Sequence, residues 1–252
     1  GHDDFTDRYQ IQKGLVKDTY EDVPVITPFI VKDSKTTVII APGGGFCMRD
    51  DEGEGNKVAK MLNDRGISAF VVAYRLQPYR FPIPCLDMQR AVRWVRAHAD
   101  EYGVPKDSVG LMGFSAGGFA AAGSAVFLGN DPVAADGYTE DEIDKENGMP
   151  DYLCPIYPVV NFDKNPCMLA NIKGSEFYTG ANKRKQWKID YALDKKHNEK
   201  AADIPTFLAY GTKDMLGGFE DYKTTLSKNL KNKVLVLDGA SHAFATSEKY
   251  LY

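Results

Sequence analysis

The chain has 252 residues, of which 43% are hydrophobic and 26% are charged. These proportions exclude a disordered or fibrous protein and are typical of a globular domain with a packed core. The 31 Lys and Arg residues against 35 Asp and Glu residues give a net charge of -4, and without a long basic stretch nucleic acid is not an expected partner. The longest nearly apolar run, residues 120–128, is too short to cross a bilayer, so we expect no membrane partner either.

At this length the chain is expected to fold as one domain over residues 1–252. Its four cysteines, at positions 47, 85, 154 and 167, show no C-x-x-C pair and no neighbouring histidine at metal-binding spacing. We therefore expect no metal, no disulfide framework and a cytoplasmic protein with reduced thiols. The chain opens with Gly1-His2-Asp3-Asp4, so a secreted protein would require a signal peptide removed ahead of Gly1. The sequence does not indicate an oligomeric state.

Short β-branched runs alternate with amphipathic runs of helix length, a pattern typical of a mostly parallel sheet with helices on both faces. The first 30 residues are expected to lie as irregular or antiparallel material on the edge of the sheet. Strands are predicted at residues 37–40, 67–73, 108–112, 153–160, 206–210 and 234–237. Helices are predicted over residues 53–65, 86–102, 116–125 and 218–231. The sequence thus predicts an α/β fold.

The predicted helix over residues 86–102 has apolar residues at spacings of three and four, which form one face. Its other faces carry Gln89, Arg90, Arg93 and Arg96. This distribution indicates a helix docked on the surface of the domain.

Two charged segments interrupt the alternation. Residues 129–150 hold seven acidic residues against one lysine, and residues 183–200 hold seven Lys and Arg residues against three acidic ones. We interpret both as solvated surface. Residues 161–203 lie between two predicted strands and contain several aromatic residues, including Trp187. Such an insertion is expected to form a small cap over a pocket.

The strongest chemical motif is Gly113-Phe114-Ser115-Ala116-Gly117, between a predicted strand and a predicted helix. A sharp strand-to-helix turn forces the serine into an unfavourable backbone conformation with its hydroxyl projecting, and side chains at the glycine positions would collide with neighbouring backbone. In this context G-x-S-x-G is the nucleophile elbow of α/β-hydrolases, so Ser115 is the predicted nucleophile. The alternative is a chance match at a glycine-rich helix start.

A serine nucleophile needs a base, and the sequence offers four histidines. His2 lies at the terminus, His98 within a predicted helix and His197 in a charged segment. His242 follows the last predicted strand, at the carboxyl end of the sheet where α/β sites form. His242 is therefore the predicted base.

Asp214 is the predicted partner of that base because it directly follows the strand at residues 206–210. Asp238 is the runner-up, although it lies close to His242 in sequence. The order Ser115, Asp214, His242 is the order that the hydrolase fold requires.

The stretch Pro42-Gly43-Gly44-Gly45-Phe46 follows a predicted strand and suits an oxyanion hole. Three glycines let backbone N–H groups point at a ligand, so Gly44 and Gly45 are predicted donors together with Ala116 at a helix N-terminus. A nucleotide-phosphate cradle is the alternative. The absence of G-x-G-x-x-G and of Gly-Lys-Ser/Thr makes it a weak one, and no organic cofactor is expected.

From about residue 37 onward the chain resembles the α/β-hydrolase esterases of the acetyl and feruloyl esterase type, and less closely the hormone-sensitive-lipase-like group. The resemblance rests on Pro42-Gly43-Gly44-Gly45-Phe46, Tyr74-Arg75-Leu76 with Pro78 and Pro82, Asp87 with Arg90-Ala91, Gly113-Phe114-Ser115-Ala116-Gly117-Gly118, Tyr157-Pro158-Val159, Gly211-Thr212-Lys213-Asp214 and Ser241-His242-Ala243-Phe244. It implies the α/β-hydrolase fold and the triad and oxyanion roles given above. It also implies that Arg75 and Asp87 form a structural pair beneath the site.

The chain departs from the family pattern at Pro42, where many relatives have histidine, at Ser241 and Ala243, where glycines are commoner, and at Met215-Leu216-Gly217-Gly218. The resemblance implies a serine carboxylesterase acting on short acyl esters, with acetylated sugars or oligosaccharides as the expected substrates. The alternatives are a feruloyl or aryl esterase, a formamidase or a peptidase on the same triad, and a binding module without catalysis. The residues expected to contact substrate are Phe46, Phe114, Met215 and Trp187.

Overall fold

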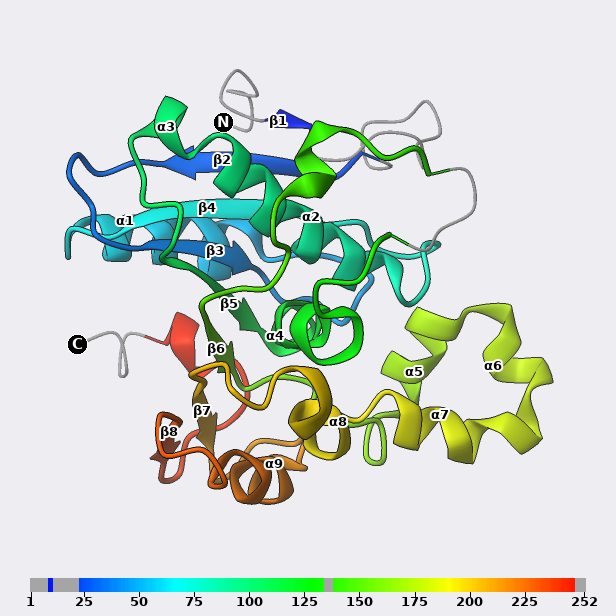
Figure 1. Ribbon diagram of the computed structural model, residues 1–252. Helices are drawn as coiled ribbons and strands as arrows, with labels where there is room; N and C mark the ends of the chain where they lie inside the picture. The colour runs from blue at the N-terminus through cyan, green and yellow to red at the C-terminus, as the bar shows by residue number, and fades with distance from the viewer. Residues whose placement is uncertain (1–8, 11–22, 134–137, 248–252) are drawn as a thin grey trace.

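The structure, a computed structural model, describes residues 9–10, 23–133 and 138–247. These residues form an eight-stranded sheet in the order β1-β2-β4-β3-β5-β6-β7-β8 (Figure 1). The strands are β1 Tyr9–Gln10, β2 Val25–Phe29, β3 Thr37–Ala41, β4 Ser68–Ala73, β5 Val109–Phe114, β6 Tyr152–Ile156, β7 Phe207–Gly211 and β8 Lys233–Leu237. β2 pairs antiparallel with β1 and β4, and the remaining neighbours are parallel.

The antiparallel edge expected of the first 30 residues is confirmed for β1 and β2, while residues 1–8 and 11–22 lie outside the described part. Helices cover both faces of the sheet: α2 and α4 lie in front of it in Figure 1, and α1 lies behind β4. The helices are α1 Lys57–Asn63, α2 Ile83–Ala97, α3 Ala99–Tyr102, α4 Ser115–Gly123, α5 Pro166–Lys173, α6 Ser175–Thr179, α7 Arg184–Asp190, α8 Leu193–Lys200 and α9 Phe219–Leu226. The predicted fold class, a mostly parallel α/β-hydrolase sheet, is confirmed.

The centre of the sheet is apolar on both faces. Ile39 of β3 lies between Phe70 of β4 and Leu111 of β5, and all three side chains are fully buried. A parallel sheet covered on both sides requires such continuous apolar strands. The core therefore sits beneath the carboxyl ends of β3 and β5, from which the glycine-rich loop and Ser115 emerge.

The predicted helix over residues 86–102 is two helices, because the chain turns at His98 between α2 and α3. The His98 ring stacks on Trp94 with 4.1 Å between centroids. The expectation of a surface helix is wrong for α2: Arg90 and Arg93 are each only 2% exposed, and Gln89 and Arg96 are buried as well. Another part of the chain must cover this face.

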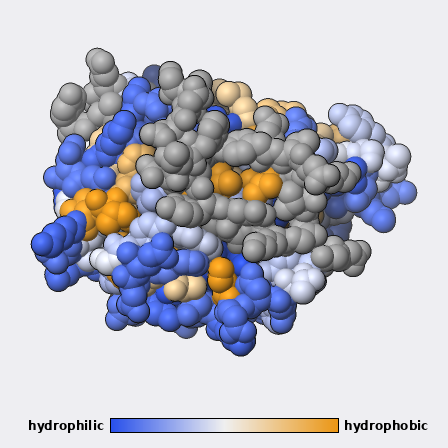
Figure 2. All heavy atoms as spheres, turned by 90° about the horizontal axis from the view of Figure 1, so that it is seen from above, coloured by the Kyte–Doolittle hydropathy of each residue, from blue (hydrophilic) through white to orange (hydrophobic). Residues whose placement is uncertain are grey.

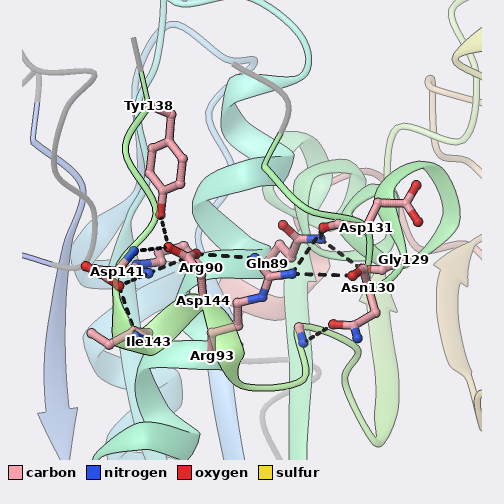
Figure 3. Close-up of polar contacts among 11 residues, drawn as sticks. Gln89, Arg90, Arg93, Gly129, Asn130, Asp131, Tyr138, Asp141, Ile143 and Asp144 are labelled. Atoms are coloured by element: carbon pink, nitrogen blue, oxygen red, sulfur yellow. Dashed lines mark hydrogen bonds and ion pairs between the residues drawn. The ribbon is translucent and has the colours of Figure 1, made fainter. Parts of the chain in front are cut away.

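Residues 129–133 and 138–151 provide that cover (Figure 3). Arg90 makes a two-pronged contact with Asp141 at 2.9 and 2.6 Å and also reaches Asp144 at 3.0 Å. Arg93 contacts Asp144 at 3.4 Å, and the Gln89 amide donates to the Gly129 carbonyl at 2.9 Å. The prediction that this acidic segment is solvated surface is therefore wrong for its inward-facing carboxylates, because their countercharges lie on α2.

The insertion between β6 and β7 has two parts in Figure 1. Helices α5 to α7 form a lobe beside the sheet, whereas α8 returns to the helix layer and packs against α9. The Phe81 N–H donates to the Ile172 carbonyl at 3.0 Å, and the rings of Phe81 and Tyr191 lie 4.4 Å apart. These contacts join the lobe to the loop before α2.

The face seen from above is predominantly hydrophilic over its described part, and its hydrophobic residues form small separate groups (Figure 2). In the ranges that the structure describes, no helix is long and apolar enough to cross a membrane.

Candidate active site

Ser115 stands at the turn between β5 and α4, and its backbone has φ of +51°. This left-handed conformation is uncommon for a residue other than glycine and stores strain at the turn. The flanking glycines are required by close approach. A Cβ on Gly113 would lie 2.3 Å from the Gly117 carbonyl oxygen, and one on Gly117 would lie 2.1 Å from the Ala41 carbonyl oxygen. The local sequence therefore holds the Ser115 hydroxyl at the carboxyl end of the sheet.

His242 lies between Ser115 and Asp214. Its Nε2 is 2.9 Å from Ser115 Oγ, and its Nδ1 is 2.9 Å from Asp214 Oδ2. The Asp214 side chain is fully buried, and its second oxygen accepts from the Leu216 N–H at 2.9 Å. The imidazole can therefore accept the serine proton on one nitrogen while the carboxylate orients the other.

The loops that carry Asp214 and His242 are bonded to one another. The Lys213 N–H donates to the Ala240 carbonyl at 3.0 Å, and the Thr212 N–H donates to the Leu237 carbonyl at 3.1 Å. Asp238, the alternative acid, instead accepts from the Thr212 hydroxyl at 3.1 Å. The structure thus brings Asp214 to His242 and turns Asp238 toward the neighbouring loop.

The other histidines lie elsewhere. His98 is at the end of α2, and His197 is buried in α8, where its Nδ1 lies 3.1 Å from the Tyr222 hydroxyl. His2 is outside the described residues.

The glycine-rich loop after β3 lies directly against Ser115. A Cβ on Gly43 would be 2.9 Å from the Ser115 Cβ. Gly44 and Gly45 have φ of +139° and +65°, which turn the loop away from strand geometry. Within the described part of the chain, the N–H groups of Gly44, Gly45 and Ala116 have no hydrogen-bond acceptor. Unpaired donors beside a serine hydroxyl are what an oxyanion hole needs.

The model of the BD-FAE family matches residues 25–230, which include the glycine-rich loop, Ser115 and Asp214. The chain belongs to the BD-FAE family.

This BD-FAE chain is similar to two known proteins over about half of its length. It is 32% identical over 131 residues to an acetylxylan esterase of Xylanibacter ruminicola, covering 52% of this chain and 24% of the relative. It is 30% identical over 152 residues to endo-1,4-beta-xylanase B of Butyrivibrio fibrisolvens, covering 56% of this chain and 22% of that relative. The chain thus spans about a quarter of the length of these relatives.

Among solved structures, the acetyl ester-xyloside bifunctional hydrolase from Caldicellulosiruptor lactoaceticus superposes with a TM-score of 0.71 at 25% identity. The match covers 96% of this chain and 90% of that one. This chain and that hydrolase therefore share their fold over nearly their whole lengths.

Two residues outside the predicted set touch the glycine-rich loop of this BD-FAE protein. The Glu54 carboxylate accepts from the Gly43 N–H at 2.7 Å, and the Asn171 amide of α5 donates to the Gly45 carbonyl at 2.8 Å. In the sequence Glu54 is one acid among several in residues 50–54, and Asn171 lies in the insertion. Neither carries a local signal that would single it out.

The four residues expected to contact substrate have different environments. Phe46 and Phe114 are buried, with their rings against Phe119 and Tyr157 at 5.6 and 5.8 Å. Met215 is 72% exposed beside the loop of Asp214. Trp187 is buried within the lobe, where Lys173 Nζ lies 4.7 Å from its ring centroid. Of the four, Met215 alone presents most of its surface to solvent.

The expected structural pair is present beneath the site. Arg75 and Asp87 are fully buried, with Arg75 Nε 3.1 Å from Asp87 Oδ1 and the Arg75 N–H 2.8 Å from Asp87 Oδ2. At Pro42, where many relatives carry histidine, the carbonyl accepts from the Tyr74 hydroxyl at 2.7 Å. Tyr74 thus supports the start of the glycine-rich loop from below.

Across residues 9–10, 23–133 and 138–247, no group of three or more His, Cys, Asp or Glu side chains could hold a metal ion.

Proposed function

We propose that this protein is a serine carboxylesterase in which Ser115 is the nucleophile, His242 the general base and Asp214 the residue that orients the imidazole. The observation that carries this proposal is the continuous contact from Ser115 Oγ through both nitrogens of His242 to Asp214, at 2.9 Å on each side. Membership of the BD-FAE family supports it.

In the proposed reaction, Ser115 Oγ attacks the ester carbonyl carbon while His242 Nε2 takes the hydroxyl proton. The N–H groups of Gly44, Gly45 and Ala116 hold the negative oxygen of the tetrahedral intermediate. The bond to the alcohol oxygen then breaks, and His242 returns its proton to that oxygen. A water molecule, deprotonated by His242, then attacks the acyl carbon. The bond from that carbon to Ser115 Oγ breaks, His242 returns the proton to Oγ, and the acid leaves. No cofactor enters these steps.

We propose acetyl groups on sugars or oligosaccharides as the substrate. The proteins to which this chain is similar include an acetylxylan esterase, a xylanase and an acetyl ester-xyloside bifunctional hydrolase. Hydrolysis of feruloyl or other aryl esters, or of amides, is the competing possibility on the same triad.

The insertion at residues 161–203 is the proposed cap of this site within a single domain. Its support is the contact of Asn171 with the Gly45 carbonyl, which places α5 against the glycine-rich loop. Since α8 packs on α9, we assign the cap to α5–α7.

The decisive experiment compares the wild-type protein with Ser115→Ala and His242→Ala on 4-nitrophenyl acetate. Because the triad acts as a unit, either substitution should lower turnover by a factor on the order of 10⁴ to 10⁶. A fluorophosphonate should label the wild-type protein at one site and leave Ser115→Ala unlabelled. Near-normal hydrolysis by Ser115→Ala would refute the assignment.

A substrate panel tests the acyl group. It should contain 4-nitrophenyl esters of increasing chain length, acetylated xylo-oligosaccharides, a feruloyl ester and a formamide. Fastest release of acetate is expected, and a preference for long chains, the feruloyl ester or the formamide would overturn the acetyl assignment.

A further inference from the structure

Glu54 is a buried acidic residue next to the nucleophile that the triad chemistry does not use. It lies in a π-helical turn over Asp51–Asn56, which begins after Asp50, and the Asp50 carboxylate accepts from the Gly53 N–H at 2.9 Å. Gly55 lets this turn approach the sheet, because a Cβ there would lie 2.9 Å from Val71 Cγ1. The turn therefore directs Glu54 inward, and only 5% of the residue is exposed.

Each oxygen of the Glu54 carboxylate accepts one hydrogen bond. Oε2 accepts from the Gly43 N–H at 2.7 Å, and Oε1 accepts from the Tyr157 hydroxyl at 2.8 Å. Gly43 lies between this carboxylate and the nucleophile, since a Cβ on Gly43 would be 2.6 Å from Glu54 Oε2 and 2.9 Å from Ser115 Cβ. One carboxylate thus joins the loop after β3 to the loop after β6.

Tyr157 carries this connection to the base. Its backbone is held at φ of +35°, and its N–H donates to the Ala209 carbonyl at 2.7 Å. Its ring contacts the ring of His242 edge-on, with 5.0 Å between centroids, and the ring of Phe244 at 4.8 Å. Tyr157 therefore stands between Glu54 and His242.

The environment of Glu54 combines burial with two hydrogen-bond donors. The pKa of Glu54 is raised, chiefly by burial, and the Tyr157 and Gly43 hydrogen bonds and the charge of His242 offset only part of that effect. Burial and the neighbouring Glu54 raise the pKa of Tyr157, which keeps the phenol protonated as a donor. Both oxygens of the buried Glu54 carboxyl group are thus paired, which offsets the cost of its burial.

We propose that Glu54 is a positioning residue that aligns two parts of the catalytic machinery at once. Through Gly43 it holds the loop that presents the Gly44 and Gly45 donors, and through Tyr157 it holds the ring against which His242 packs. The proposal rests on the esterase function proposed above. Such a residue stabilises the transition state more than the bound substrate, because the oxyanion and the His242 imidazolium form together in the transition state.

Three variants test the proposal by turnover per active site, titrated with a fluorophosphonate. Glu54→Ala removes both hydrogen bonds and should lower kcat for 4-nitrophenyl acetate by about 100-fold, with KM changed less than about threefold. Glu54→Gln keeps an oxygen for the Gly43 N–H and removes the charge, so a fall of about tenfold is expected. Tyr157→Phe removes one hydrogen bond and should lower kcat about fivefold.

The matched control is Glu52→Gln, an exposed carboxylate two residues away in the same turn, which should leave kcat unchanged. A merely structural role for Glu54 would lower the thermal midpoint or the number of titrated sites but leave kcat per site intact. That result, or a loss confined to KM, overturns the proposal. If Glu54→Ala does not fold, Glu54→Gln and Tyr157→Phe decide by the same criteria.

The two proposals fail in different ways. An inactive wild-type protein, or an active Ser115→Ala, removes the esterase function and the role of Glu54 with it. An active wild type, an inactive Ser115→Ala and Glu54 variants with wild-type kcat per site remove the role of Glu54 alone.

Discussion

The two charged segments of this chain have similar compositions of opposite sign but different structural roles. The inward carboxylates of residues 129–151 meet arginines on α2, and Asp144 is nearly buried between Arg90 and Arg93. The lysines of residues 183–200 face solvent, where pairs such as Lys196 with Glu199 are exposed. The difference shows that a run of charges becomes a structural contact only where another element supplies buried countercharges. We refer to residues 129–133 and 138–151 with their α2 partners as the arginine clamp.

The largest effect is expected when the arginine clamp loses Asp144. Asp144→Ala removes the carboxylate that Arg90 and Arg93 share, so the free energy of unfolding should fall by about 3 kcal/mol in urea titrations. Glu142→Ala is the matched control, since the Glu142 side chain is 87% exposed, and should stay within about 0.5 kcal/mol of wild type. Equal effects of the two variants would mean that the clamp contributes no more than the exposed surface.

The second largest effect is expected on lowering the pH, which should affect the stability of the two segments differently. Burial lowers the pKa of His197 in α8 to about 4, so below its ordinary value of 6.5 the unfolded chain binds a proton that the native protein excludes. The free energy of unfolding should therefore fall by about 2 kcal/mol from pH 7.5 to 5 through this group. Asp141 of the clamp keeps its charge in that window, because the Arg90 hydrogen bond lowers the pKa of Asp141.

Urea unfolding of the wild-type protein and of His197→Gln at the two pH values isolates the contribution of His197 to the pH dependence of stability. The variant should lose that part of the pH dependence, and hydrogen exchange at pH 5 should increase in α8 but not in the clamp. An unchanged slope in His197→Gln would show that other groups cause it.

A smaller effect, on activity and not on stability, is expected at the lobe. Asn171→Ala removes the hydrogen bond to the Gly45 carbonyl, and kcat/KM for 4-nitrophenyl acetate should fall about tenfold while the free energy of unfolding changes by less than about 1 kcal/mol. Asn182→Ala, on an exposed turn of the same lobe, provides the control and should behave as wild type. Loss of stability without loss of activity would contradict a role of the lobe at the site.

The smallest effect is expected for the exposed lysines. Lys196→Ala breaks a solvent-exposed pair with Glu199 and should change the free energy of unfolding by less than about 0.5 kcal/mol. Thermal or urea unfolding tests this prediction. A larger change would mean that these lysines contribute to stability as the clamp does.

Much of the fold was predictable because its strands are short apolar runs that end in glycine, proline or a helix start. The strands at residues 37–41 and 68–73 lie within a residue of the predicted bounds. The prediction was less accurate at α2, where the pattern of apolar residues identified the inner face of the helix but gave no information about what covers the outer one. Partners such as Asp141 and Asp144 lie about fifty positions from Arg90, and no local pattern connects them.

The sequence by itself determined the residues whose chemistry depends on local geometry. Gly113 and Gly117 allow the strained turn at Ser115, and the positions of Asp214 and His242 after successive strands bring both to the carboxyl edge of a parallel sheet. Only the tertiary structure decided that Glu54 and Asn171 bond the glycine-rich loop and that the arginines of α2 are buried. These contacts join elements distant in sequence, and burial and pairing are properties of the packed molecule that residue type and spacing do not encode.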